Sequence, residues 1–167
     1  MRKVYYWSPC LANVGTVIST LNSAISLSKY SKKKFDVNLI NVCGEWDKYK
    51  DFFFSNDIKI IDLNFKYFNL LPKTGFLASR FSYLIIFILS FVPLLNLLKK
   101  NKPDYIIIHL ITSLPLILLN LFKFKTKFIL RISGFPKLTF LRKFLWKISS
   151  EKVYLVTTPT IHLIDQL

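Results

Sequence analysis

Short apolar runs recur along the chain and predict six buried strands. Each run is nearly continuous and rich in β-branched and aromatic residues, which is typical of strands. The runs are Lys3 to Trp7, Phe35 to Cys43, Ile58 to Leu63, Tyr105 to His109, Lys127 to Ile132 and Val153 to Thr157. Because these runs leave no polar side for water, we expect a sheet that is covered on both faces.

Segments with helical spacing or long uncharged runs separate the strands. Apolar residues at every third or fourth position predict amphipathic helices, and Ser or Thr before the first turn favours a helix start. The predicted helices are Thr16 to Lys29, Ser79 to Leu98, Thr112 to Phe122 and Leu138 to Ile148, with a further helix starting at Thr160. Residues 64–78, which include Pro72 and Gly75, predict a loop.

Strands that alternate with helices imply right-handed crossovers and a parallel sheet. We therefore expect a single doubly wound, Rossmann-like α/β domain over residues 1–167, with strand order 3-2-1-4-5-6 and helices on both faces. Ligands bind such sheets at the carboxyl ends of the strands, beside the switch point between strands one and four. The segments predicted to meet there are 8–16, 109–113, 133–137 and 158–160.

Composition excludes some classes of protein. Hydrophobic residues make up 52% of the chain, so it is not intrinsically disordered. The net charge is +15, but lysine greatly outnumbers arginine and no zinc-finger, helix-turn-helix or other nucleic-acid motif is present. We therefore expect no nucleic-acid partner, and a negatively charged membrane surface or an anionic ligand fits the charge better.

The cysteines and the N-terminus indicate a reducing compartment. Cys10 and Cys43 are too few for a disulfide framework or a zinc site, so we expect free thiols and no metal. The apolar run from Val4 to Trp7 is shorter than the core of a signal peptide. The sequence therefore favours a cytoplasmic location.

Four positions at the predicted ligand edge could carry chemistry. Gly15 follows the first strand, where backbone N–H groups could hold an anion or a sugar hydroxyl, although a tight turn needing positive φ explains it equally well. His109 ends an apolar strand and is either a catalytic group or a structural core residue. Arg131 is costly to bury unless an anion or carbonyl pairs with it; a structural ion pair or an edge position is the alternative. Thr158 offers a hydroxyl, or caps the next helix.

These motifs together resemble landmarks of the N-terminal domain of family 4 glycosyltransferases, which are GT-B enzymes. The matching runs are Pro103-Asp104-Tyr105-Ile106-Ile107-Ile108-His109, Leu130-Arg131-Ile132-Ser133-Gly134-Phe135-Pro136-Lys137 and Thr157-Thr158-Pro159-Thr160. The likeness is greatest to bacterial members that build lipopolysaccharide or capsule. The first loop departs from the pattern, because many relatives have paired glycines where this chain has Val14-Gly15.

The resemblance implies a retaining transfer of sugar from a nucleotide-diphosphate sugar to an acceptor hydroxyl, without a metal. In this family the first domain mainly holds the glycan or lipid-linked acceptor, and a second domain binds the donor. That second domain is absent here, so we expect a fragment that is inactive alone. His109 would be catalytic, and the residues that hold acceptor or phosphate would be Asn13, Gly15, Thr16, Arg131, Ser133, Gly134, Thr158 and Thr160.

The segment from Ser79 to Leu98, in which only Arg80 is charged, leaves two membrane interpretations open. A peripheral contact with the inner face of the plasma membrane would use Arg80, Phe81, Lys99, Lys100 and Lys102. A two-span membrane protein, with spans at 81–98 and 105–122, is the alternative to a transferase half. A third possibility is an isolated Rossmann-like module that binds a phosphorylated small molecule.

Overall fold

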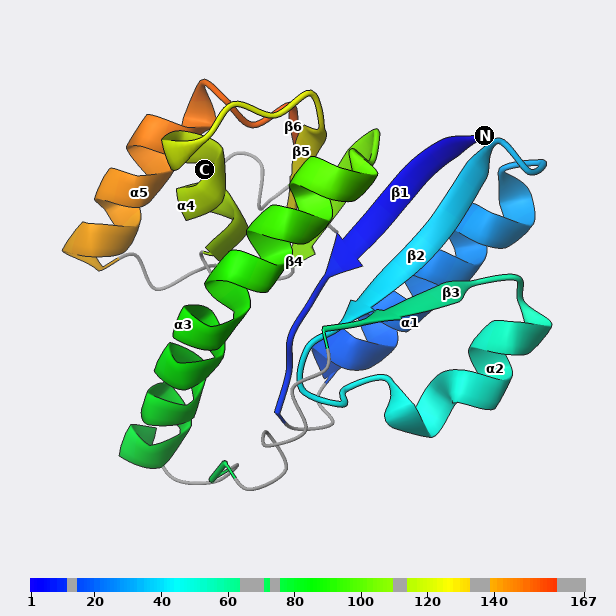
Figure 1. Ribbon diagram of the computed structural model, residues 1–167, viewed down its shortest axis with the longest axis horizontal. Helices are drawn as coiled ribbons and strands as arrows, with labels where there is room; N and C mark the ends of the chain where they lie inside the picture. The colour runs from blue at the N-terminus through cyan, green and yellow to red at the C-terminus, as the bar shows by residue number, and fades with distance from the viewer. Residues whose placement is uncertain (12–14, 64–70, 73–75, 110–113, 133–138, 159–167) are drawn as a thin grey trace.

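The computed structural model describes residues 1–11, 15–63, 71–72, 76–109, 114–132 and 139–158 (Figure 1). The strands are β1 (Arg2–Trp7), β2 (Phe35–Asn41), β3 (Lys59–Asp62), β4 (Tyr105–His109), β5 (Lys127–Arg131) and β6 (Leu155–Thr157). The α-helices are α1 (Gly15–Tyr30), α2 (Lys50–Ser55), α3 (Phe76–Asn101), α4 (Leu114–Leu121) and α5 (Phe140–Ser150), and a short 3-10 helix, η1 (Asp47–Tyr49), precedes α2.

The six strands form one parallel sheet with the order β3-β2-β1-β4-β5-β6. This confirms the predicted doubly wound α/β fold. The register pairs Trp7 with Ile108, His109 with Arg131, and Arg131 with Thr157. The last residues of β4, β5 and β6 therefore lie side by side at the carboxyl edge of the sheet, where the sequence predicts the site.

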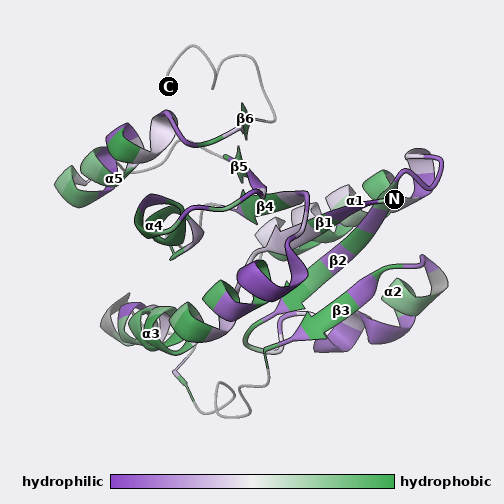
Figure 2. Ribbon diagram, turned by 45° about the horizontal axis from the view of Figure 1, so that its top comes forward, coloured by the Kyte–Doolittle hydropathy of each residue, from purple (hydrophilic) through white to green (hydrophobic). Residues whose placement is uncertain are grey.

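Helices cover both faces of the sheet (Figure 1, Figure 2). α1 and α2 pack on one face, where Val4, Tyr6 and Leu39 are buried. α3, α4 and α5 pack on the other face, where Trp7 and Ile40 are buried. Because successive strand residues point to opposite faces, β1 buries side chains in both layers, which explains its uninterrupted apolar run.

A helical segment after β2 is absent from the sequence prediction. η1 and α2 carry Trp46 and Phe53 into the core, with ring centroids 5.9 Å apart in an edge-to-face contact. The Trp46 indole N–H donates to the Ile40 carbonyl at 3.1 Å, which fixes the turn to the end of β2. Trp46, Tyr49 and Phe53 are spaced by three and four residues, and this helical spacing is the signal that could have predicted the segment.

α3 is longer than its sequence predicts. It begins at Phe76, so the predicted loop over 64–78 is wrong for residues 76–78, and it continues to Asn101. Pro93 lies inside the helix, where it removes one backbone hydrogen bond, but the neighbouring Leu94 is completely buried against the sheet layer. The Asn101 amide donates to the Tyr5 hydroxyl at 2.9 Å and ties the end of the helix to β1.

The two-span interpretation is wrong. Its second span, residues 105–122, contains the central strand β4 and the eight-residue helix α4, neither of which can cross a bilayer. Over the described residues, one segment, Arg80–Asn101 of α3, is long and apolar enough to cross a membrane by length and composition, and 28% of its most apolar window is buried inside the protein.

Candidate functional site

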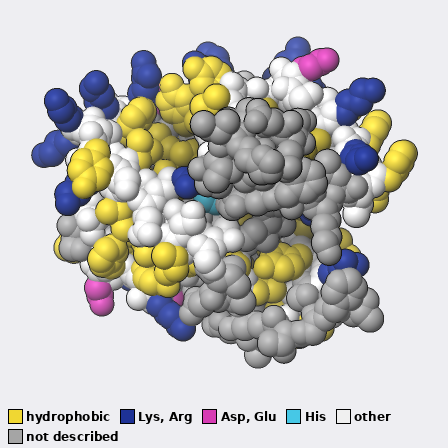
Figure 3. All heavy atoms as spheres, turned by 180° about the vertical axis from the view of Figure 1, so that it is seen from behind, with side chains coloured by type: hydrophobic (Ala, Val, Ile, Leu, Met, Phe, Trp, Pro, Cys, Tyr) yellow, Lys and Arg dark blue, Asp and Glu magenta, His cyan; other side chains and the backbone are white. Residues whose placement is uncertain are grey.

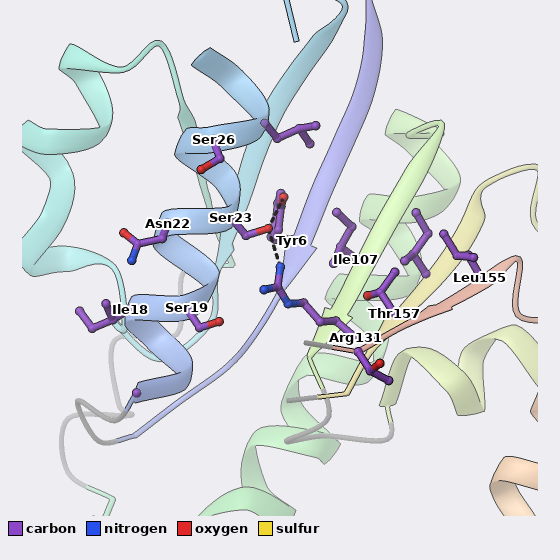
Figure 4. Close-up of a pocket in the computed structure, with 14 residues that line it drawn as sticks. Tyr6, Ile18, Ser19, Asn22, Ser23, Ser26, Ile107, Arg131, Leu155 and Thr157 are labelled. Atoms are coloured by element: carbon purple, nitrogen blue, oxygen red, sulfur yellow. Dashed lines mark hydrogen bonds between the residues drawn. The ribbon is translucent and has the colours of Figure 1, made fainter. Parts of the chain in front are cut away.

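A cavity of about 920 Å³ opens on the α1 face of the sheet (Figure 4). One wall is α1, which covers β1 and β2. The floor is formed by Ile107 of β4, Ile129 of β5 and Leu155 of β6, over which none of the described helices lies on this face. Residues far apart in the sequence therefore line one space at the carboxyl half of the sheet.

A hydrogen-bonded cluster joins the two sides of the cavity. The Arg131 guanidinium reaches from β5 toward α1 and donates from Nη1 to Ser23 Oγ at 2.8 Å (Figure 4). The Ser23 hydroxyl also shares a hydrogen bond of 3.1 Å with the Tyr6 hydroxyl of β1. Sequence reasoning missed Tyr6 and Ser23, because only the fold brings α1 against β5.

Within the described chain, neither an edge position nor a structural ion pair explains Arg131. β5 lies between β4 and β6, so Arg131 is not at an edge of the sheet. Among the described residues, the ion pairs Lys50–Asp47 and Lys59–Asp36 involve other cations, and none of these residues forms an ion pair with Arg131. The guanidinium is half-buried and bonded to a neutral hydroxyl, so it can bind an anion in the cavity.

His109 lies next to Arg131 in the pairing register but is not on the lining of the cavity. The side chain is completely buried, its ring centroid is 6.5 Å from that of Tyr6, and neither Nδ1 nor Nε2 has a hydrogen-bond partner among the described residues. Burial, and secondarily the charge of Arg131, lowers the pKa of His109 to about 4. The imidazole is therefore neutral at pH 7 and can both donate and accept a proton.

Gly15 and Thr158 line the same cavity as Arg131. The tight-turn explanation of Gly15 is wrong, because the glycine in the left-handed region within the described chain is Gly44. A Cβ at position 15 would meet no atom within 4 Å, so neither backbone conformation nor crowding requires glycine there. Thr16 is not on the lining; its carbonyl accepts from the Thr20 hydroxyl at 2.8 Å.

Four residues named by the sequence lie outside the described part of the chain. They are Asn13, Ser133, Gly134 and Thr160. Their roles in holding acceptor or phosphate stay predictions.

Glu45, in the turn after β2, has a structural role. Glu45 is buried, and its carboxylate accepts from the backbone N–H groups of Val42 at 3.1 Å and Cys43 at 2.7 Å. Burial raises the pKa of Glu45 to about 7, against the effect of these hydrogen bonds. Neither Cys10 nor Cys43 forms a disulfide. Over the described residues, no group of three or more His, Cys, Asp or Glu side chains is placed to hold a metal ion.

The far side of the molecule carries an exposed apolar stripe on α3. Phe81, Leu84, Ile88 and Val92 are all more than half exposed and follow one another at three- or four-residue spacing. Cations lie at both ends of the helix, with exposed Arg80 at its start and Lys99, Lys100 and Lys102 at its end. This stripe faces away from the sheet. Figure 3 shows the opposite, α1 face of the molecule, where the Lys and Arg side chains lie mainly around the periphery.

The comparisons with known proteins give a likeness in structure but no match in sequence family. No family model matches the chain, and none of the curated proteins does. Among solved structures the chain is similar to the crystal structure of CalG4, the calicheamicin glycosyltransferase, with 12% sequence identity and a TM-score of 0.48. The match covers 89% of this chain and 37% of that one. A likeness of this size identifies neither a family nor an activity, so the function has to come from the residues of the chain itself.

Proposed function

We propose that this chain is the acceptor-binding half of a glycosyltransferase and that the sugar acceptor lies in the cavity between α1 and β4–β6. One observation carries the proposal. Gly15, Arg131 and Thr158 come from three separate sequence motifs, and all three line one cavity at the carboxyl half of a doubly wound sheet. Ligands bind such sheets at this edge, because the strand ends and helix starts there present unpaired polar groups.

Each polar group has a role in this proposal. Arg131 binds negative charge on the acceptor or on a phosphate, and the neutral His109 beside it orients or polarises the reacting centre. The resemblance to family 4 enzymes supports a retaining transfer from a nucleotide-diphosphate sugar, without a metal, in the assembly of a cell-envelope glycan. The donor would bind to a second domain, so the chain alone would be inactive.

Transfer assays on a longer protein that contains this domain test the proposal. Arg131→Ala and His109→Ala should each lower the transfer rate by roughly 100-fold, whereas Lys48→Ala, which removes an exposed cation in η1, should leave it unchanged. The 167-residue chain alone should transfer no sugar. Transfer by the chain alone would contradict the two-domain proposal, and full activity of both the Arg131→Ala and the His109→Ala variants would contradict the site.

The same proposal places the domain on the inner face of the plasma membrane, with α3 as the contact. The apolar stripe with cations at both ends supports this, because such a helix lies in the interface of an anionic bilayer. α5, in the same helix layer (Figure 2), adds the exposed residues Phe140, Phe144, Lys143 and Lys147. A lipid-linked acceptor would then reach the cavity, which opens on the opposite face, around an edge of the sheet.

Flotation with phosphatidylglycerol vesicles tests the membrane contact. The triple variant Lys99→Gln, Lys100→Gln, Lys102→Gln should float several-fold less than the parent, because each cation near an anionic surface contributes about 1 kcal/mol. Its control is Lys32→Gln, Lys33→Gln, Lys34→Gln, which removes the same charge from the exposed turn after α1. Release of the parent by a salt wash is the expected result, and retention until detergent is added would indicate insertion of α3 instead. Equal flotation of the two triple variants would contradict a contact through α3.

A further inference from the structure

We infer that the cavity between α1 and β4–β6 selects an acidic saccharide, a sugar whose carboxylate or phosphate group binds Arg131. The inference rests on the proposed function and adds the chemical class of the acceptor. It comes from the polar groups that line the cavity and from the absence of an opposite charge among them.

Arg131 has no carboxylate partner among the described residues. Its guanidinium donates a hydrogen bond from Nη1 to the Ser23 hydroxyl. A half-buried cation without a counter-charge is costly, so an anion in the cavity stabilises it. The planar guanidinium suits a carboxylate or a phosphate, because either can accept two parallel N–H bonds.

Most of the polar groups around the Arg131 charge are hydroxyls. Among the described residues of the cavity lining, the polar side chains other than Arg131 and the Asn22 amide are hydroxyls: Tyr6, Ser19, Ser23, Ser26, Thr157 and Thr158. Ser19 and Ser23 point from α1 toward the strands, and Thr157 lies opposite them (Figure 4). Hydroxyl groups both donate and accept, as sugar hydroxyls do, so they match a saccharide better than a bare inorganic anion.

The floor of the cavity is apolar beneath the hydroxyls. It is formed by Ile107, Ile129 and Leu155. A pyranose ring presents C–H groups on its faces and hydroxyls around its rim, so it can cover this floor while its rim reaches Ser19 and Thr157. His109 adds no charge at neutral pH, so preference for an acidic sugar depends on Arg131.

Calorimetry or saturation-transfer NMR, used to measure the binding of four probes to the 167-residue chain, tests the inference. The probes are D-glucuronate, D-glucose 6-phosphate, D-glucose and inorganic phosphate. Glucuronate or glucose 6-phosphate should bind about tenfold or more tightly than glucose, since a hydrogen bond to a charged group is stronger than one to a neutral group. Which of the two binds better distinguishes a carboxylate from a phosphate. Inorganic phosphate should bind more weakly than the preferred acidic sugar.

Variants assign the preference to the cavity. Arg131→Gln should reduce the affinity for the acidic sugar to that for glucose, while Lys48→Gln, which removes the same charge from the exposed η1, should not. Ser19→Ala, on the half-buried side of α1, should weaken the binding of glucose and of glucuronate by the same factor. Ser31→Ala, beyond the end of α1, should weaken the binding of neither sugar. Ser19→Ala keeps the test available if Arg131→Gln does not fold.

Two results would overturn the inference. One is equal affinity for glucose and both acidic sugars, and the other is binding of inorganic phosphate as tight as that of glucose 6-phosphate. Failure of the chain to bind any sugar is a different outcome, because it contradicts the proposed function as well.

Discussion

His109 and Arg131 lie side by side at the ends of β4 and β5. Burial lowers the pKa of His109, and the charge of Arg131 adds to this effect. Among the described residues, the imidazole has no hydrogen-bond partner that would stabilise its charged form. The pair therefore combines one permanent cation with one neutral group, rather than two cations that repel each other.

This arrangement predicts how stability depends on pH. In the unfolded chain His109 takes up a proton near pH 6.5, whereas in the folded chain it does so near pH 4. The contribution of His109 to the free energy of unfolding should therefore fall between pH 6.5 and pH 4, by roughly 3 kcal/mol at the lower end. Urea unfolding of the parent and of His109→Gln at several pH values measures this contribution as the difference in the free energy of unfolding between the two proteins.

Glu45 has the opposite dependence and provides the internal check. Its pKa is raised from 4.5 to about 7, so its contribution to stability is present below pH 4.5 and is lost as the pH rises through 7. Both the parent and the His109→Gln variant contain Glu45, so its effect cancels in their difference. A difference that stays constant from pH 7 to pH 4 would show that His109 is not buried as a neutral group.

Ser23 is the residue that holds the cavity cluster together. Ser23→Ala would leave Arg131 and the Tyr6 hydroxyl without their shared partner, so we expect a loss of about 1–3 kcal/mol in the free energy of unfolding. Ser26→Ala, an exposed position one turn later, should change it by no more than about 0.5 kcal/mol. Chemical denaturation measures both, and equal effects would contradict the hydrogen-bonded cluster.

The sequence predicted part of this site and missed the rest for a physical reason. Arg131, Gly15 and Thr158 follow or end apolar runs, so strand order alone brings them to one edge. The partner of Arg131 is Ser23, which is 108 residues away and lies in the middle of a helix. No local pattern distinguishes Ser23 from the other serines of α1, because the contact depends on how α1 packs on the sheet.

At the scale of elements, α3 is the helix that the sequence could least well classify as a membrane span or a core helix. Its apolar residues are so frequent that periodicity cannot tell a membrane span from a core helix. The structure separates two sides, one buried against the sheet at Ile86, Leu94 and Leu98, the other exposed. α3 is therefore a crossover helix between β3 and β4 that also presents an apolar outer side.

Two substitutions on opposite sides of α3 test this description. Leu94→Ala removes a completely buried side chain and should cost about 2–5 kcal/mol in the free energy of unfolding. Val92→Ala, where the side chain is 58% exposed, should cost no more than about 0.5 kcal/mol. Thermal or urea unfolding without detergent measures both. The reverse order would mean that the outer side of α3, rather than the inner one, is packed.

The strands were the most predictable elements and the short helices the least. β4 has the predicted bounds, and the other strands differ from theirs by a few residues at their ends. Central strands are buried on both faces, so their sequences are apolar throughout and easy to recognise. η1 and α2 are too short to show repeated periodicity, and they depend on Trp46 and Phe53 reaching the core.

At the scale of the whole molecule, the two proposed surfaces lie on opposite faces of the sheet. The cavity opens on the α1 face, and the apolar and basic side of α3 belongs to the other helix layer. A lipid-linked acceptor held by a membrane under α3 would therefore reach the cavity around an edge of the sheet. The carboxyl edge, where β4, β5 and β6 end, is the side on which Gly15 and Thr158 lie.

The most direct test of this account is an amide NMR map of the 167-residue chain during titration with D-glucuronate. We predict that the largest shifts fall on Ser19 and Ser23 of α1, Arg131 of β5 and Thr157 of β6, because these residues line one cavity. Shifts concentrated on α4 and α5, on the opposite face of the sheet, or no shifts at concentrations that saturate other sugar-binding domains, would contradict a saccharide site in this cavity.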